Sequence, residues 1–208
     1  MYITEIYINY TNNERKNWVK YNTVNVVDLE STCDEIQDSS KSEIIEIGIV
    51  EVNLHTFEID KKRSIYVKPL QASITKFCYD LTGISQELID TQGISLSRAF
   101  DTLKLEYNSE NRLWFSFGDY DKNMLMQESR KKSLIYPMYK RHLNIKTLTS
   151  VFESFPKEES LKGTLEKLNM KFIGKPHSGA DDAYNTARIL IYLLKKYKGL
   201  PFNKWKII

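Results

Sequence analysis

The sequence predicts a single α/β domain in which helices flank a mixed sheet. Three runs rich in Ile and Val, between residues 23 and 69, have the composition of consecutive strands. From residue 73 onward, helical and strand-like segments alternate, and such alternation places helices on the faces of a sheet. The chain has 208 residues, about the length of one sizeable domain, so we expect one folded unit.

Four segments have the pattern of strands, and a fifth is a shorter candidate. Residues 23–30 form a β-branched run that ends in acids, which is typical of a buried strand. Residues 43–53 and 57–69 follow as the second and third strands, and the short link between them predicts a hairpin. Residues 112–118 are the fourth predicted strand, and residues 142–148 are the candidate for a short fifth strand.

Helical patterns occupy most of the chain after residue 73. The predicted helices cover residues 73–81, 85–92, 95–107, 121–132, 160–169 and 179–197. Ser73, Ser85 and either Ser95 or Ser97 are candidate N-caps, because a serine hydroxyl can accept a hydrogen bond from a free amide of the first turn.

The predicted domain covers residues 23–198, after an irregular extension over 1–22 and before a short tail over 199–208. No apolar run is long enough to cross a membrane, and the N-terminus lacks the pattern of a secretory signal, so we expect no membrane partner. Cys33 and Cys78 are too few for a disulfide framework, so we expect reduced thiols and a cytoplasmic protein. The net charge of +3 is compatible with a polyanionic partner without requiring one.

Two carboxylates end the first predicted strand. Asp28 and Glu30 are two residues apart, so both side chains project from the same face of the strand. Buried acids must be paired or bind a metal, and carboxylate oxygens are suitable ligands for divalent cations. An ordinary surface pair of acids is the alternative at this point.

A second pair of acids follows the fourth predicted strand. Asp119 and Asp121 come directly after Phe117 and Gly118, where one of the two acids can point back toward the first pair. Aspartate is also frequent at the start of a helix, where it complements the helix dipole. Taken alone, this second pair favours the capping alternative.

The last predicted helix begins with a histidine and two acids. His177 comes at or just before its start, and Asp181 and Asp182 lie in its first turn. A histidine five residues before a carboxylate can place its imidazole beside a metal ligand without binding the metal itself. A capping loop whose acids interact with the helix dipole is the alternative.

In this order, the three patterns resemble the DEDDh family of 3′–5′ exonucleases, also called DnaQ-like, which has a ribonuclease-H-like fold. The resemblance implies a mixed five-stranded sheet flanked by helices. The implied metal ligands are Asp28, Glu30, Asp121 and Asp182. The implied catalytic residues are Glu30 and His177, with His177 as the general base and also as a substrate-binding residue. Asp121 is preferred to Asp119 because the family has its acid directly after an aromatic residue, here Tyr120.

Five segments make the resemblance more specific. They are residues 30–34, 42–53, 77–85, 118–121 and 175–189. They are similar to the enhanced-RNAi branch of exonucleases, which trims the ends of small RNAs and histone mRNA, and to its bacterial relatives. This resemblance places Ser31 and Thr32 beside the terminal nucleotide. It places Gly83 and Ile84 near the last base and allows Tyr120 to stack on a base. Core packing is the alternative for Ile84 and Tyr120.

The implied activity is that of a metal-dependent 3′–5′ exonuclease that releases nucleoside 5′-monophosphates from single-stranded 3′ ends and prefers RNA. Two Mg²⁺ or Mn²⁺ ions per active site are the implied cofactors. A DNA-directed exonuclease and a nucleic-acid-binding regulatory module with the same fold are the other two functions considered. All five catalytic positions are filled, which argues against the module. Selectivity for RNA requires a contact to the 2′-hydroxyl, which the sequence does not locate.

Overall fold

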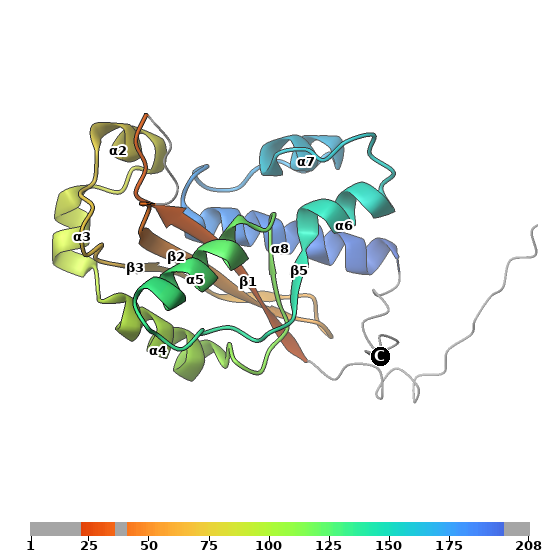
Figure 1. Cartoon of the computed structure of the whole chain (residues 1–208). Helices are drawn as coiled ribbons and strands as arrows, with labels where there is room; N and C mark the ends of the chain where they lie inside the picture. Colours follow the sequence, from red (N-terminus) through yellow and green to blue (C-terminus); the bar gives the residue numbers. More distant parts are fainter. Residues whose placement is uncertain (1–21, 36–40, 198–208) are drawn as a thin grey trace, which may run out of the picture.

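The computed structural model describes residues 22–35 and 41–197 (Figure 1). Within these residues, five strands form one mixed sheet in the order β3-β2-β1-β4-β5. The strands are β1 (Thr23–Ser31), β2 (Ile44–Asn53), β3 (Ile59–Tyr66), β4 (Trp114–Ser116) and β5 (His142–Asn144). The predicted α/β class and five-stranded sheet are confirmed, whereas the predicted extension up to Tyr21 and the predicted tail lie outside the described residues.

The central strand of the sheet is β1. It pairs with β2 in antiparallel orientation and with β4 in parallel orientation. The predicted hairpin of β2 and β3 is present, and β5 is parallel to β4. Because β1 and β4 are parallel, their carboxyl ends lie at the same edge of the sheet. The acids that follow these two strands are therefore close together.

Helices cover both faces of the sheet (Figure 1). They are α2 (Lys76–Thr82), α3 (Gln86–Gln92), α4 (Leu96–Tyr107), α5 (Tyr120–Lys131), α6 (Ile145–Phe152), α7 (Leu161–Lys167) and α8 (Gly179–Lys196). Val24 and Val26 of β1 pack in one core cluster with α6, α7 and α8, whereas Val27 and Leu29 pack in another with α4 and α5. This division follows from the alternation of side chains along a strand.

The predicted N-caps of three helices can be compared with the structure. Ser85 caps α3 and Ser95 caps α4, as predicted. The cap of α2 is Thr75 instead of Ser73, because the Thr75 side chain accepts a hydrogen bond from the Cys78 N–H. The prediction of Ser73 as an N-cap is therefore wrong by two residues.

The fifth predicted strand is shorter than expected. It ends at Asn144, and residues 145–148 belong to α6, so the strand prediction is wrong for its second half. β5 pairs with β4 only as far as Ser116, so the backbone after Asn144 has no partner strand among the described residues. The Asn144 side chain instead accepts a hydrogen bond from the Thr147 N–H and caps the helix.

The described residues contain no helix that is both long enough and apolar enough to span a membrane. Cys33 and Cys78 both carry free thiols, as expected. Cys33 lies two residues after the end of β1, and Cys78 lies on the buried side of α2.

Candidate active site

The carboxyl end of β1 carries the first two candidate ligands. Asp28 pairs with Gly48 of β2, and Glu30 pairs with Glu46. Both acids lie on the same face of the strand as Val26, which is the face that α8 covers. Because Glu30 is only 9% exposed, the alternative of an ordinary surface pair does not apply.

A third acid comes from the first turn of α5. Asp121 is buried, and its Oδ1 accepts a hydrogen bond of 2.9 Å from the backbone N–H of Leu29. Leu29 lies between Asp28 and Glu30 in the sequence. This hydrogen bond therefore connects the start of α5 to the strand that carries the first two acids.

The turn before α8 holds Asp182 and His177 together. The backbone N–H of His177 donates a hydrogen bond of 3.0 Å to Oδ2 of Asp182. His177 has a φ of 60°, a left-handed conformation that is uncommon for residues with a side chain, and it is exposed. Ligand atoms of Glu30, His177 and Asp182 all lie within 4.8 Å of one another. The structure thus brings the three segments singled out in the sequence to one place.

Burial raises the pKa values of all four acids, and repulsion by other acids of the cluster adds to this effect at Asp28, Glu30 and Asp182. Burial, followed by the charge of Glu46, raises the pKa of Glu30 to about 8. Burial raises the pKa of Asp182 to about 7 and that of Asp121 to about 6, although backbone hydrogen bonds act in the opposite direction. Burial and then the charge of Asp121 hold the pKa of Asp28 well above its ordinary range.

The donor set fits divalent cations. It consists of carboxylate oxygens, which are the ligands that Mg²⁺ and Mn²⁺ prefer. Lys175 offsets part of the negative charge at Glu30, but the converging acids still repel one another. The residues that would hold the cations are Asp28, Glu30, Asp121 and Asp182.

We expect the metal-free protein to become more stable as the pH falls from about 8 toward about 5. The pKa of Glu30 is about 8 in the folded protein against an ordinary value of 4.5, so folding takes up a proton in this range. Above the pKa of the folded protein, Glu30 is ionised, and its buried charge lowers the free energy of unfolding. Protonation of Glu30 at lower pH removes this destabilisation. Thermal unfolding in EDTA at about pH 6 and about pH 8.5 measures the difference. Glu30→Gln should weaken the dependence, and a lower melting temperature at the lower pH would contradict it.

Asp119 lies outside the cluster of acids. Its side chain is 54% exposed and forms an ion pair of 3.2 Å with Lys122. Its other oxygen accepts a hydrogen bond from the Asn144 amide. Asp119 is the residue before α5, whereas Asp121 points to β1. This placement supports Asp121 as the ligand of this segment.

Substitution of the two aspartates should separate their roles. We expect Asp121→Asn to lower turnover by ~10²-fold or more, because charge stabilisation by bound cations is worth several kcal/mol. Asp119→Asn removes the charge of an exposed side chain that lies outside the cluster and should change turnover by less than about fivefold. Both variants are assayed across a Mn²⁺ titration. Inactivity of Asp119→Asn with an active Asp121→Asn would reverse the assignment.

A groove of about 1160 Å³ lies beside the cluster, between α2 and α5. Ser31 and Tyr120 line the groove and are the sequence neighbours of Glu30 and Asp121, which do not line it themselves; the two hydroxyl oxygens are 2.7 Å apart. Tyr120 is 46% exposed, so its ring is accessible for stacking and the core-packing alternative does not apply to it. Phe77 and Leu81 of α2 also line the groove.

Three other predicted substrate contacts lie in different surroundings. Thr32 borders the groove but is buried, and its hydroxyl accepts a hydrogen bond from a neighbouring backbone N–H. Ile84 is buried in the core between α2 and α3, so the packing alternative applies and its side chain does not reach the groove. Gly83 ends α2 with a φ of 77°, and a Cβ there would lie 1.9 Å from the Nζ of Lys175.

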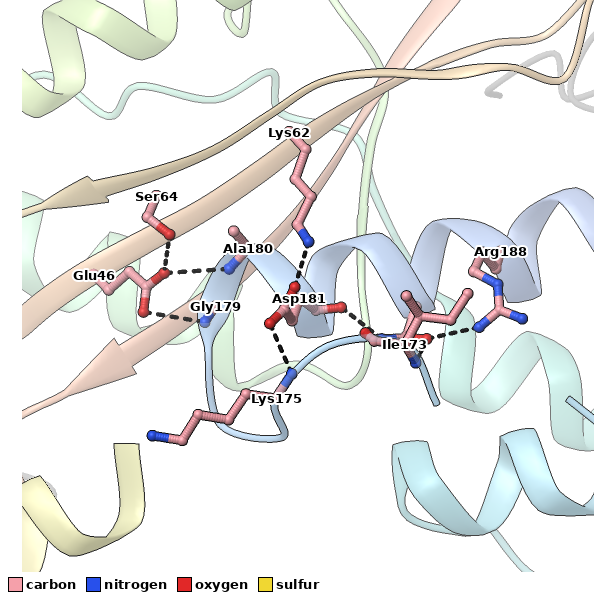
Figure 2. A network of polar contacts seen from close by, with 10 residues as sticks. Glu46, Lys62, Ser64, Ile173, Lys175, Gly179, Ala180, Asp181 and Arg188 are labelled. Atoms are coloured by element: carbon pink, nitrogen blue, oxygen red, sulfur yellow. Dashed lines mark hydrogen bonds and ion pairs between the residues drawn. The ribbon is translucent and has the colours of Figure 1, made fainter. Parts of the chain in front are cut away.

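Two charged residues near the cluster have no role in the sequence interpretation. Glu46 is 1% exposed and accepts hydrogen bonds from the amides that begin α8 (Figure 2). Lys175 donates a hydrogen bond from Nζ to the carbonyl of Thr82. An acid inside the apolar run of β2 is a usable signal for Glu46, because a buried carboxylate needs partners. Lys175 has no comparable signal in the sequence.

The sheet order and the converging acids define an exonuclease domain of the ribonuclease-H-like class. A family model described as Exonuclease (RNase_T) matches residues 26–190, and this chain belongs to that family. The resemblance to the DEDDh exonucleases is confirmed by the solved structure of one of their members. That structure is the nuclease domain of 3′hExo bound to rAMP, with a TM-score of 0.76 and 31% identity over 85% of this chain and 94% of that chain.

Two further similar proteins are an exoribonuclease and an exonuclease that recognises an mRNA stem-loop. Human 3′-5′ exoribonuclease 1 is 32% identical over 194 residues, which are 88% of this chain and 56% of that protein. A structure of the 3′-end specific recognition of a histone mRNA stem-loop by a 3′-exonuclease has a TM-score of 0.75 and 30% identity, over 85% of this chain and 65% of that chain. The chain therefore spans little more than half the length of the curated relative it matches.

Proposed function

We propose that this protein is a metal-dependent 3′–5′ exonuclease that releases nucleoside 5′-monophosphates from single-stranded 3′ ends and prefers RNA. The observation that carries this proposal is the convergence of buried acids from β1, α5 and α8 beside the exposed His177. Two relatives, an exoribonuclease and a 3′-exonuclease in the 3′-end specific recognition of a histone mRNA stem-loop, support RNA as the substrate class.

Mg²⁺ or Mn²⁺ ions, two per site, are the proposed cofactors. When bound, they would supply charge stabilisation to the phosphate under attack. The chain contributes the four carboxylates, and the pKa values of Glu30 and Asp182 are raised to about 8 and about 7 in the metal-free protein. Binding should therefore release protons and be weaker at low pH.

His177 is assigned to proton transfer. Its ring lies close to the carboxylate oxygens of Glu30 and Asp182, and the residue is exposed. The imidazole takes a proton from the attacking water while the bond between phosphorus and the 3′ oxygen of the preceding nucleotide breaks. That oxygen takes a proton from solvent, and the released nucleotide keeps its 5′ phosphate.

The groove is assigned to the nucleotides at the 3′ end of the substrate. The Ser31 and Tyr120 hydroxyls, on the residues that follow Glu30 and precede Asp121, offer a donor and an acceptor to which a ribose hydroxyl can bind. The Tyr120 ring and the side chains of Phe77 and Leu81 offer apolar surface to bases. Of the substrate contacts inferred from the sequence, Ser31 and Tyr120 are the two with exposed side-chain hydroxyls at the groove.

A comparison of RNA with DNA tests the proposal. Single-stranded RNA and DNA of the same sequence, labelled at the 5′ end, are incubated with the protein in Mg²⁺, in Mn²⁺ or in EDTA. We expect stepwise shortening from the 3′ end with release of 5′-monophosphates, faster for RNA and absent in EDTA. Equal or faster digestion of DNA would reject the RNA preference. Intact RNA and DNA in the presence of either cation would reject the activity.

A further inference from the structure

The strand β2 contacts the start of α8 through the buried side chain of Glu46 (Figure 2). Its Oε2 accepts a hydrogen bond of 3.1 Å from the Gly179 N–H, and its Oε1 accepts one of 3.2 Å from the Ala180 N–H. The Ser64 hydroxyl of β3 donates a third hydrogen bond, of 2.5 Å, to Oε1. Both oxygens of Glu46 are therefore directed to donors of α8 and β3.

The first turn of α8 depends on this carboxylate for hydrogen-bond partners. Ser178 occupies the N-cap position but makes no capping hydrogen bond with its side chain. The amides of a first helical turn have no partners within the helix, and negative charge is favourable there. Gly179 and Ala180 are buried, so water does not easily replace a missing partner. Glu46 of β2 therefore supplies the hydrogen-bond acceptors that an N-cap side chain supplies in other helices.

Two glycines allow the helix to start this close to the sheet. A Cβ on Gly48 would lie 1.8 Å from the carbonyl carbon of Gly179. A Cβ on Gly179 would lie 3.1 Å from the carbonyl oxygen of Asp28 and 3.2 Å from the carboxylate carbon of Glu46. The start of α8 is thus in close contact with the backbone of Asp28, one of the four acids.

The turn that Glu46 contacts also carries the two site residues of α8. His177 lies two residues before Gly179, and Asp182 lies three residues after it. The hydrogen bond from the His177 N–H to Asp182 makes this turn one connected unit. A shift of the Gly179 and Ala180 amides would therefore move both the acid and the imidazole relative to Glu30.

We infer that Glu46 is a positioning residue for the proposed exonuclease reaction, an inference that rests on that function. Its carboxylate fixes the first turn of α8 and thereby sets where Asp182 and His177 lie relative to the acids of β1. Glu46 acts through these residues: its carboxylate contacts α8, and it is not among the residues that line the groove.

Glu46→Ala and Glu46→Gln test this role, with Glu51→Gln as the matched control. Glu51 is another buried acid of β2, and its partners are Lys61 and Arg112 instead of α8. We expect Glu46→Ala to lower kcat by ~10–100-fold and to weaken Mn²⁺ binding by a similar factor, with KM for RNA nearly unchanged. Glu46→Gln retains one acceptor oxygen and should have an intermediate effect. Glu51→Gln should leave kcat and Mn²⁺ binding unchanged.

The amide protons of Gly179 and Ala180 give a readout without catalysis. In the metal-free protein, Glu46→Gln should shift both resonances upfield, because hydrogen bonds to a carboxylate are stronger than those to an amide oxygen. If the wild-type protein digests no nucleic acid, the proposed function fails, whereas these shifts and calorimetric Mn²⁺ binding still test the position of Glu46. If Glu46→Ala does not fold, Glu46→Gln decides alone. Wild-type kcat and Mn²⁺ binding in Glu46→Gln, with only a lower melting temperature, would overturn the inference.

Discussion

Asp28→Ala is expected to lower nuclease activity by ~10³-fold or more, because the loss of a cation ligand removes several kcal/mol of charge stabilisation. The variant should remain folded. Burial and the neighbouring acids Asp121, Asp182 and Glu30 raise the pKa of Asp28. Removing Asp28 relieves this repulsion, so the melting temperature in EDTA should stay the same or rise. Turnover of labelled RNA with Mn²⁺ and thermal unfolding in EDTA measure the two effects.

Asp60→Ala is a suitable control for this substitution. Asp60 is an exposed aspartate of β3, so its loss should change neither turnover nor metal binding. Near-normal turnover of Asp28→Ala would remove β1 from the metal site. A large fall in its melting temperature in EDTA would instead show that Asp28 stabilises the metal-free fold.

His177→Ala is expected to lower kcat by ~10²–10⁴-fold, the range for general acid–base catalysis, and to retain Mn²⁺ binding. A base is needed in the transition state, so its loss affects kcat more than KM. The hydrogen bond from residue 177 to Asp182 comes from the backbone and remains in the variant. The φ of 60° makes His177→Asn a useful second variant, because asparagine adopts left-handed conformations more readily than alanine.

The pH dependence of kcat separates a base from a ligand. Wild-type activity should fall at acidic pH as the imidazole becomes protonated, and this limb should weaken in both His177 variants. His55→Ala is the control, because His55 is exposed and hydrogen-bonded to Asn22. A collapse of calorimetric Mn²⁺ binding in both His177 variants would show that the imidazole is a ligand and would reject the base.

Local sequence was sufficient for the elements that carry the site. The β-branched runs of β1 and β2 and the apolar spacing of α8 are recognisable because a central strand and a sheet-packed helix bury apolar side chains in any α/β fold. The pair Asp28 and Glu30 was recognisable because charged side chains at the end of a buried strand are costly without a partner. The family resemblance then connected this pair with Asp121 and Asp182, which the structure brings close to it.

The wrong predictions depend on contacts between distant segments. Ser73 and Thr75 are equally suitable caps by local sequence, and the hydrogen bond from the Thr75 hydroxyl to the carbonyl of Cys33 favours Thr75. Ile84 lies next to Gly83 between two predicted helices, and the core-packing alternative left open for it holds because it packs between α2 and α3. The end of β5 is set by the end of β4, which no pattern within residues 142–148 encodes.

The strand β1 lies between β2, which is close to it in the sequence, and β4, which is far from it in the sequence. This arrangement has a consequence for the order of folding. β1, β2 and β3 are consecutive in the chain, so their pairing closes short loops, whereas β4 and α8 must join from far along the sequence. Pairings between distant segments are slow because loop closure must come first. The acids of β1 should therefore be in place early, and Asp182 should reach them in one of the last steps. We expect divalent cations to slow unfolding more than they accelerate folding, because interactions that form after the transition state act on the unfolding rate.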